Sequence, residues 1–153
     1  VGEGDYRAEL ERIASRAGVA DHVRFPGFLG GADKVRLLQE SRVLAYTSPK
    51  EGWGLSVIEA GACATPVVAS DSPGLCESVV DGKTGFLVRH GDIADLAGKM
   101  TALLSDDALA QGMAEEGVRW AATFNWESSA ENTLKLIDEI VAGRSDRGKQ
   151  AGR

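Results

Sequence analysis

Apolar residues recur along the chain in two patterns, which together predict helices alternating with short strands. Helical spacing predicts a helix over residues 5–16, which Gly18 ends. Short apolar runs predict strands at residues 23–25, 43–46, 66–70 and 85–88. Further helices are predicted at residues 33–41, from 54 or 55 onward, at 74–79, after Asp92, after Asp106 and at about 126–141. Short buried strands separated by helices indicate an α/β fold, a Rossmann-like parallel sheet between helices, although the strand order cannot be derived from the chain.

Length and composition are those of one globular domain. The chain has 153 residues, of which 43% are hydrophobic and 26% are charged. We expect one domain over residues 1–142 and a disordered tail over 143–153, where glycine, polar and basic residues gather. The net charge of −6 argues against a nucleic-acid partner, because binding to a phosphate backbone needs clustered lysine and arginine.

Cysteine usage and the lack of long apolar segments bear on the compartment. Cys63 and Cys76 are the two cysteines, they lack the spacing of a zinc site, and they are predicted to be small buried residues. No signal peptide is apparent, and no window approaches the roughly 18 apolar residues that span a membrane. These features predict a cytoplasmic protein.

The stretch from Ser48 to Val80 carries the candidate chemistry. A glycine-rich loop at 51–54 leads into a helix whose first residue is near Gly54 or Leu55. Backbone N–H groups at a helix N-terminus are unpaired, and the helix dipole adds partial positive charge there, which suits a phosphate or diphosphate. The preceding strand delivers this loop at its carboxyl end, where parallel sheets bind ligands.

Two carboxylates, Glu51 and Glu59, flank this turn. Carboxylates would be a poor choice for binding phosphate alone, but they accept strongly from the hydroxyl groups of a sugar. A glutamate on a helix is more often only solvated. Glu59, however, has apolar or small neighbours, and a carboxylate in such a position needs a partner or a function.

The run EGWGLSVIE and the following ACATPVVASDSPGL resemble the donor-binding half of the retaining GT-B glycosyltransferases of group 1, the family 4 type. This resemblance spans roughly residues 1–139 and implies a Glu-x7-Glu motif that binds a nucleotide-sugar. It implies that Glu51 is the catalytic residue and contacts the sugar hydroxyls, and that Glu59 holds the ribose hydroxyls. The backbone of Gly52, Trp53, Gly54 and Leu55 would contact the sugar and diphosphate.

The resemblance also places the nucleotide base near Phe25, Pro26, Gly27 and Phe28, although Phe25 and Phe28 could equally fill a core. It implies no bound metal, because backbone amides and basic side chains stabilise the leaving diphosphate. Pro73 stands where the family usually has glycine, and a proline lacks one backbone donor. His22 and His90 form no pattern with a serine that would indicate a hydrolase.

In this family an acceptor-binding domain precedes the donor-binding domain, so the chain is expected to be a fragment that is inactive without it. The implied partners are a nucleotide-sugar donor, the missing domain, and an acceptor that is often a lipid at a membrane or a polysaccharide. The expected reaction is transfer of a glycosyl group to an acceptor hydroxyl with retention of configuration. The alternatives are a sugar-nucleotide epimerase, a glucan synthase, or a non-catalytic module that binds nucleotide or sugar.

Overall fold

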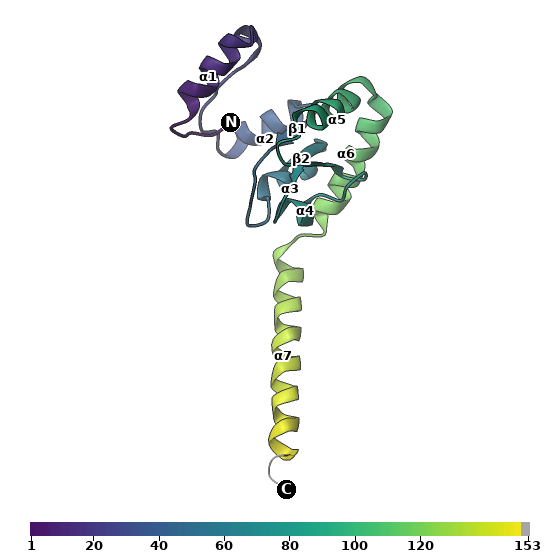
Figure 1. Cartoon of the computed structure of the whole chain (residues 1–153). Helices are drawn as coiled ribbons and strands as arrows, with labels where there is room; N and C mark the ends of the chain where they lie inside the picture. Colours follow the sequence, from purple (N-terminus) through teal and green to yellow (C-terminus); the bar gives the residue numbers. More distant parts are fainter. Residues whose placement is uncertain (151–153) are drawn as a thin grey trace. The chain divides into compact units, whose positions relative to one another are not determined.

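The computed structural model describes residues 1–150, with the side chains of residues 1–141. The chain divides into two compact units, Val1–Ser41 and Arg42–Arg153. The first unit contains α1 (Arg7–Arg16), the short 3-10 helix η1 (Ala20–His22) and α2 (Gly31–Glu40) (Figure 1). In the second unit the elements are, in chain order, β1 (Leu44–Tyr46), α3 (Leu55–Ala62), β2 (Val67–Asp71), α4 (Leu75–Ser78), β3 (Gly85–Arg89), α5 (Ile93–Ser105), α6 (Asp107–Ala122) and α7 (Trp126–Gln150).

The predicted parallel sheet is confirmed in the second unit. It has three strands in the order β1-β2-β3, and both pairings are parallel, with Ala45 opposite Val68 and Ala69 opposite Leu87. A parallel pair needs a crossover connection, and α3 and α4 supply the two crossovers. The carboxyl ends of all three strands therefore lie at one edge of the sheet.

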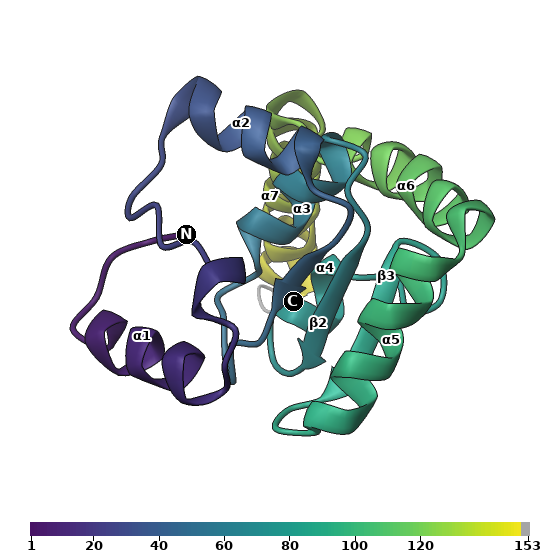
Figure 2. The ribbon, with the colours of Figure 1, turned by 90° about the horizontal axis from the view of Figure 1, so that it is seen from above.

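Helices cover both faces of this sheet. Alternate residues of a strand point to opposite faces, so neighbouring residues of β2 pack against different helices. Val68 of the central strand is buried with Val88, Leu103 and Met113, in a core that α5 and α6 complete. Val67, the preceding residue, faces a small cavity lined by α3 and α6. Figure 2 shows β2 between α3 and α5.

Side-chain caps begin two of the helices where the sequence predicted them. The carboxylate of Asp92 accepts from the backbone N–H of Asp95 at 3.0 Å, and that of Asp106 accepts from the N–H of Leu109 at 2.9 Å. Each satisfies an N–H group that the first turn of a helix leaves unpaired. These caps fix the starts of α5 and α6.

Several predicted elements differ from those in the structure. The strand at 23–25 is wrong: these residues pair with no strand among the described residues, and strand pairing depends on partners that local sequence does not reveal. The helix predicted from Asp33 begins at Gly31. The expected disordered tail at 143–153 overlaps α7, which continues to Gln150, and residues 151–153 lie outside the described residues.

Side-chain burial also differs at particular positions. Cys76 is exposed and Cys63 is only half-buried, so neither is the buried small residue that was predicted. Trp126, the first residue of α7, is 88% exposed in the described chain. None of the helices in residues 1–150 is both long enough and apolar enough to cross a bilayer.

Candidate functional site at the start of α3

The loop between β1 and α3 enters its helix as the sequence predicted. α3 begins at Leu55, and Gly54 precedes it with a left-handed φ of 87°. A Cβ on Gly54 would lie 2.8 Å from Leu75 Cδ2 and 2.9 Å from Ser78 Oγ, so the position has no room for a side chain. The helix N-terminus is thus held tightly against α4.

A second loop, which follows β2, supports the loop that carries Glu51. The N–H of Glu51 donates to the carbonyl of Pro73 at 3.1 Å, and Ser72 Oγ donates to the carbonyl of Ser48 at 3.0 Å. A Cβ on Gly74 would lie only 2.4 Å from the Glu51 carbonyl oxygen. Pro73 therefore contributes an acceptor, which proline retains, and the departure from the family pattern costs no donor in this contact.

The charges of Glu51 and Glu59 both raise the pKa of one phenol, that of Tyr46. The hydroxyl of Tyr46, the last residue of β1, donates to Glu51 Oε1 at 3.3 Å. The pKa of Tyr46 is raised above its ordinary value by burial, then by the charge of Glu51 and the hydrogen bond to it, and further by the charge of Glu59. The structure therefore places Glu51 beside the carboxyl end of β1, with the charge of Glu59 near enough to affect the same phenol.

The other predicted residues of this loop differ in exposure. Gly52 and Leu55 are exposed, Gly54 is buried, and Glu51, Trp53 and Glu59 are half-buried. The Trp53 ring packs edge to face against Phe124, with centroids 4.6 Å apart, and Phe124 packs in the same manner against Trp120 at 4.9 Å. The indole of Trp53 is thus occupied by protein contacts, and its main chain is what it can offer a ligand.

Phe25, Pro26, Gly27 and Phe28 belong to the first unit. Phe25 is half-buried, with the Arg7 guanidinium 5.8 Å from its ring centroid, whereas Phe28 is 73% exposed. The carbonyl of Gly27 accepts from the N–H of Gly2 at 2.8 Å. Phe25, Pro26 and Gly27 help to line a cavity of about 350 Å³ within that unit. Their contact with a nucleotide base stays a prediction.

Tyr46 is not among the site residues predicted from the sequence, where it is only part of a buried strand. Its position at the carboxyl end of that strand, directly before the glycine-rich loop, was a signal that could have identified it. Metal ligation has no support in the described residues, since no group of three or more His, Cys, Asp or Glu side chains there could hold an ion.

The comparisons with known proteins agree with this geometry. The profile of the family "Glycosyl transferases group 1" matches residues 1–120. A D-inositol 3-phosphate glycosyltransferase of Corynebacterium jeikeium is 35% identical over 150 residues, which are 97% of this chain and 36% of that protein. The chain thus spans about a third of the length of that curated relative.

Solved structures show the same fold. Sucrose-phosphate synthase from Thermosynechococcus elongatus superposes with a TM-score of 0.81 and 31% identity, over 92% of this chain and 35% of that one. Anabaena Alr3699/HepE, solved in complex with UDP-glucose, gives a TM-score of 0.79 and 28% identity, over 88% of this chain and 37% of that one. The chain therefore belongs to the group 1 glycosyltransferase family, and its α/β fold matches the C-terminal domain of the GT-B fold.

Proposed function

We propose that residues 1–142 bind a nucleotide diphosphate sugar and that, together with an acceptor-binding domain, they transfer its glycosyl group to an acceptor hydroxyl with retention of configuration. The observation that carries this proposal is the hydrogen bond from Tyr46 to Glu51 beside the N-terminus of α3, the helix that also carries Glu59. This arrangement offers acceptors for hydroxyl groups next to backbone donors for a diphosphate. The UDP-glucose complex of the Anabaena protein supports a uridine or related donor.

Each group has a proposed role. Glu51 accepts from the sugar hydroxyls as the catalytic residue, and Glu59 accepts from the ribose hydroxyls. The main chain of residues 52–55 contacts the sugar and diphosphate, where N–H groups at the start of α3 offset the charge that develops on the leaving diphosphate. Phe25 and its neighbours through Phe28 contact the base.

Isothermal titration calorimetry tests this division of roles. The wild-type chain is titrated with UDP and UDP-glucose, with GDP and GDP-mannose, and with ADP and ADP-glucose, and at least one of the three pairs is expected to bind. Glu59→Gln should weaken the nucleotide and its sugar conjugate equally, by about tenfold or more, because a hydrogen bond to a charged group contributes about 1.5–3 kcal/mol. Glu51→Gln should weaken only the sugar conjugate.

Glu131→Gln is the matched control, because this exposed glutamate lies on α7 and carries the same change of charge. It should bind as the wild type does. The proposal fails if none of these ligands binds, or if Glu59→Gln binds the nucleotide and the sugar conjugate of the pair that binds as tightly as the wild type does. For the longer protein, product analysis distinguishes glycosyl transfer from isomerisation of the donor.

A further inference from the structure

The Tyr46 hydroxyl is the point where the polar side chains of the Glu51 loop and α3 converge. It donates to Glu51 Oε1 at 3.3 Å, and the Ser56 side chain, in the first turn of α3, lies near enough to affect its pKa. Ser56 lowers the pKa of the phenol, whereas burial and Glu51 raise it. The phenol of β1 is therefore joined to the Glu51 loop by a directed hydrogen bond.

Such a hydrogen bond restricts the carboxylate in a way that packing alone does not. The terminal torsion of a glutamate is broad and roughly two-fold, so an unrestrained carboxylate samples many orientations. A donor fixed to one of its oxygens selects an orientation and directs the second oxygen elsewhere. Tyr46 can do this because it ends a strand of the sheet and is itself half-buried.

The geometry points to Tyr46 as a positioning residue for Glu51, holding the carboxylate in the orientation that accepts a hydrogen bond from the donor sugar. This inference rests on the proposed function, and it assigns the sugar moiety, not the nucleotide, as the part of the ligand that depends on Tyr46. The raised pKa keeps the phenol protonated, and so a donor, throughout the neutral range.

Tyr46→Phe tests this inference because it removes the hydroxyl and leaves the ring in place. The dissociation constants of UDP and UDP-glucose are measured for the wild type, Tyr46→Phe, Glu51→Gln and the double variant. Tyr46→Phe should weaken UDP-glucose about three- to tenfold, the worth of one hydrogen bond, and change UDP less than about twofold. The double variant should bind UDP-glucose no more weakly than Glu51→Gln alone, because Tyr46 acts through Glu51.

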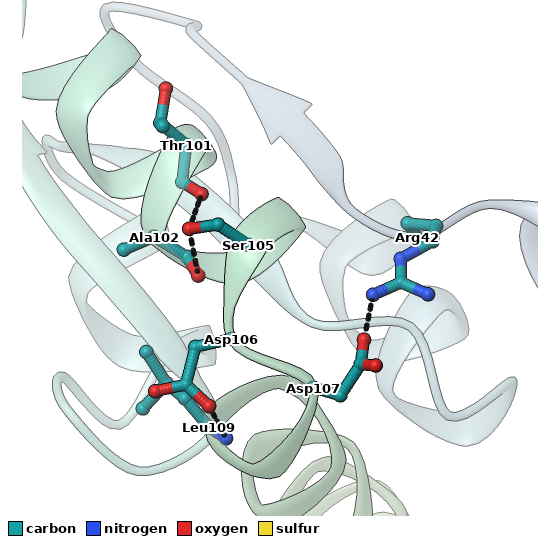
Figure 3. Close-up of polar contacts among 7 residues, drawn as sticks. All are labelled: Arg42, Thr101, Ala102, Ser105, Asp106, Asp107 and Leu109. Atoms are coloured by element: carbon teal, nitrogen blue, oxygen red, sulfur yellow. Dashed lines mark hydrogen bonds and ion pairs between the residues drawn. The ribbon is translucent and has the colours of Figure 1, made fainter.

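Two further variants guard against a general effect of removing a hydroxyl. Ser56→Ala should weaken UDP-glucose in the same direction but less, and it provides a second test should Tyr46→Phe fail to fold. Ser105→Ala is the control: its hydroxyl donates to the Thr101 carbonyl at 2.7 Å, at the far end of α5 from the carboxyl edge of the sheet (Figure 3). Ser105→Ala should leave both ligands unchanged.

The outcomes separate this inference from the proposed function. Equal weakening of UDP and UDP-glucose by Tyr46→Phe, or effects that multiply in the double variant, would overturn the positioning role. Unchanged UDP-glucose binding in Tyr46→Phe, with Glu51→Gln weakened, would overturn the inference and leave the proposed function standing. A further case is that the wild type binds GDP-mannose or ADP-glucose and not UDP-glucose. In that case the same variants are measured with the ligand that binds. If Tyr46→Phe then binds this ligand as tightly as the wild type does, the inference is overturned. Absence of binding of all ligands overturns both.

Discussion

Gly61 of α3 and Gly117 of α6 face each other where the two helices meet. A Cβ on Gly61 would lie 3.0 Å from the Gly117 carbonyl oxygen, and a Cβ on Gly117 would lie 3.3 Å from the Gly61 Cα. The neighbours are backbone atoms, which cannot rotate away as a side chain can. This contact presses α3, and with it Glu59, against the rest of the second unit.

Gly61→Ala should therefore destabilise the fold. Overpacking costs about 1–3 kcal/mol, and the better helix propensity of alanine returns at most about 1 kcal/mol. We expect the free energy of unfolding, measured in urea, to fall by about 1–2 kcal/mol. Gly112→Ala, in α6 with nothing within 4 Å of its Cβ, should instead raise it by about 0.5–1 kcal/mol. Equal effects of the two changes would contradict the close contact.

Gly74→Ala should disturb the loop of Glu51. Gly74 has a φ of 86°, and its Cβ would lie 2.4 Å from the Glu51 carbonyl oxygen, so one of the two loops must move. We expect a destabilisation of about 2–5 kcal/mol, from unfavourable backbone angles and overpacking together. Thermal melting and UDP-glucose titration measure the two consequences.

Gly82→Ala is the control that measures the cost of the unfavourable backbone angles without overpacking. Gly82 has a φ of 73°, but nothing lies within 4 Å of its Cβ. Gly82→Ala should lower the free energy of unfolding by only about 1–2 kcal/mol and leave UDP-glucose binding unchanged. Should Gly74→Ala bind UDP-glucose as the wild type does, the Gly74 contact would not be what places Glu51.

Figure 3 shows two polar contacts that should contribute differently to the free energy of unfolding, namely the cap of α6 by Asp106 and the ion pair of Arg42 with Asp107. Asp106 caps α6, and Asp106→Ala should lower the free energy of unfolding by about 1 kcal/mol, within a range of about 0.5–2. Arg42 pairs with Asp107, but their side chains are 54% and 87% exposed. Arg42→Ala should therefore change the free energy of unfolding by less than about 0.5 kcal/mol. Chemical denaturation of both variants gives the comparison, and a larger loss in Arg42→Ala would reverse this ranking.

Stability above pH 10 should depend on Tyr46. Burial first, and then the charge and hydrogen bond of Glu51, raise the pKa of Tyr46 above its ordinary value of 10.0, with Glu59 adding to the shift. The folded state therefore holds the phenol proton more tightly than the unfolded state does. The resulting stabilisation is complete below the ordinary value and is lost as the pH rises through the raised one.

Urea unfolding between pH 8 and 11 measures this loss, at values chosen on either side of about pH 10, the ordinary pKa of tyrosine. The free energy of unfolding of the wild type should fall more steeply than that of Tyr46→Phe above that value. All other ionisable groups are common to both proteins, so their contributions cancel in the difference. Parallel curves over the whole range would show that the Tyr46 phenol is not held in this way.

Local chemistry explains which elements could be predicted from the sequence. Asp92 and Asp106 each cap a helix through atoms three residues away, and Gly54 precedes α3 because the turn leaves no room for a side chain. Such signals are contained in a few adjacent residues. The predicted starts of α3, α5 and α6 therefore agree with the structure.

Features that depend on distant residues could not be derived in this way. Whether residues 23–25 pair as a strand depends on a neighbour elsewhere in the chain. The direction of the Tyr46 hydroxyl depends on how β1 is placed against α3, and the exposure of Trp126 depends on what packs beside α7. The carboxylates of the candidate site were identified from the sequence, but the phenol that donates to Glu51 was not.

Tyr46, Glu51, Ser56 and Glu59 all come from one strand, the loop after it and the helix that follows. The proposed contacts with a sugar thus come from a single contiguous module, while the remaining helices of the unit supply rigidity. Substitutions in α5 or α6 can then change the stability of the domain without changing its ligand. Transferring the module to a related sheet should transfer the preference for the sugar as well.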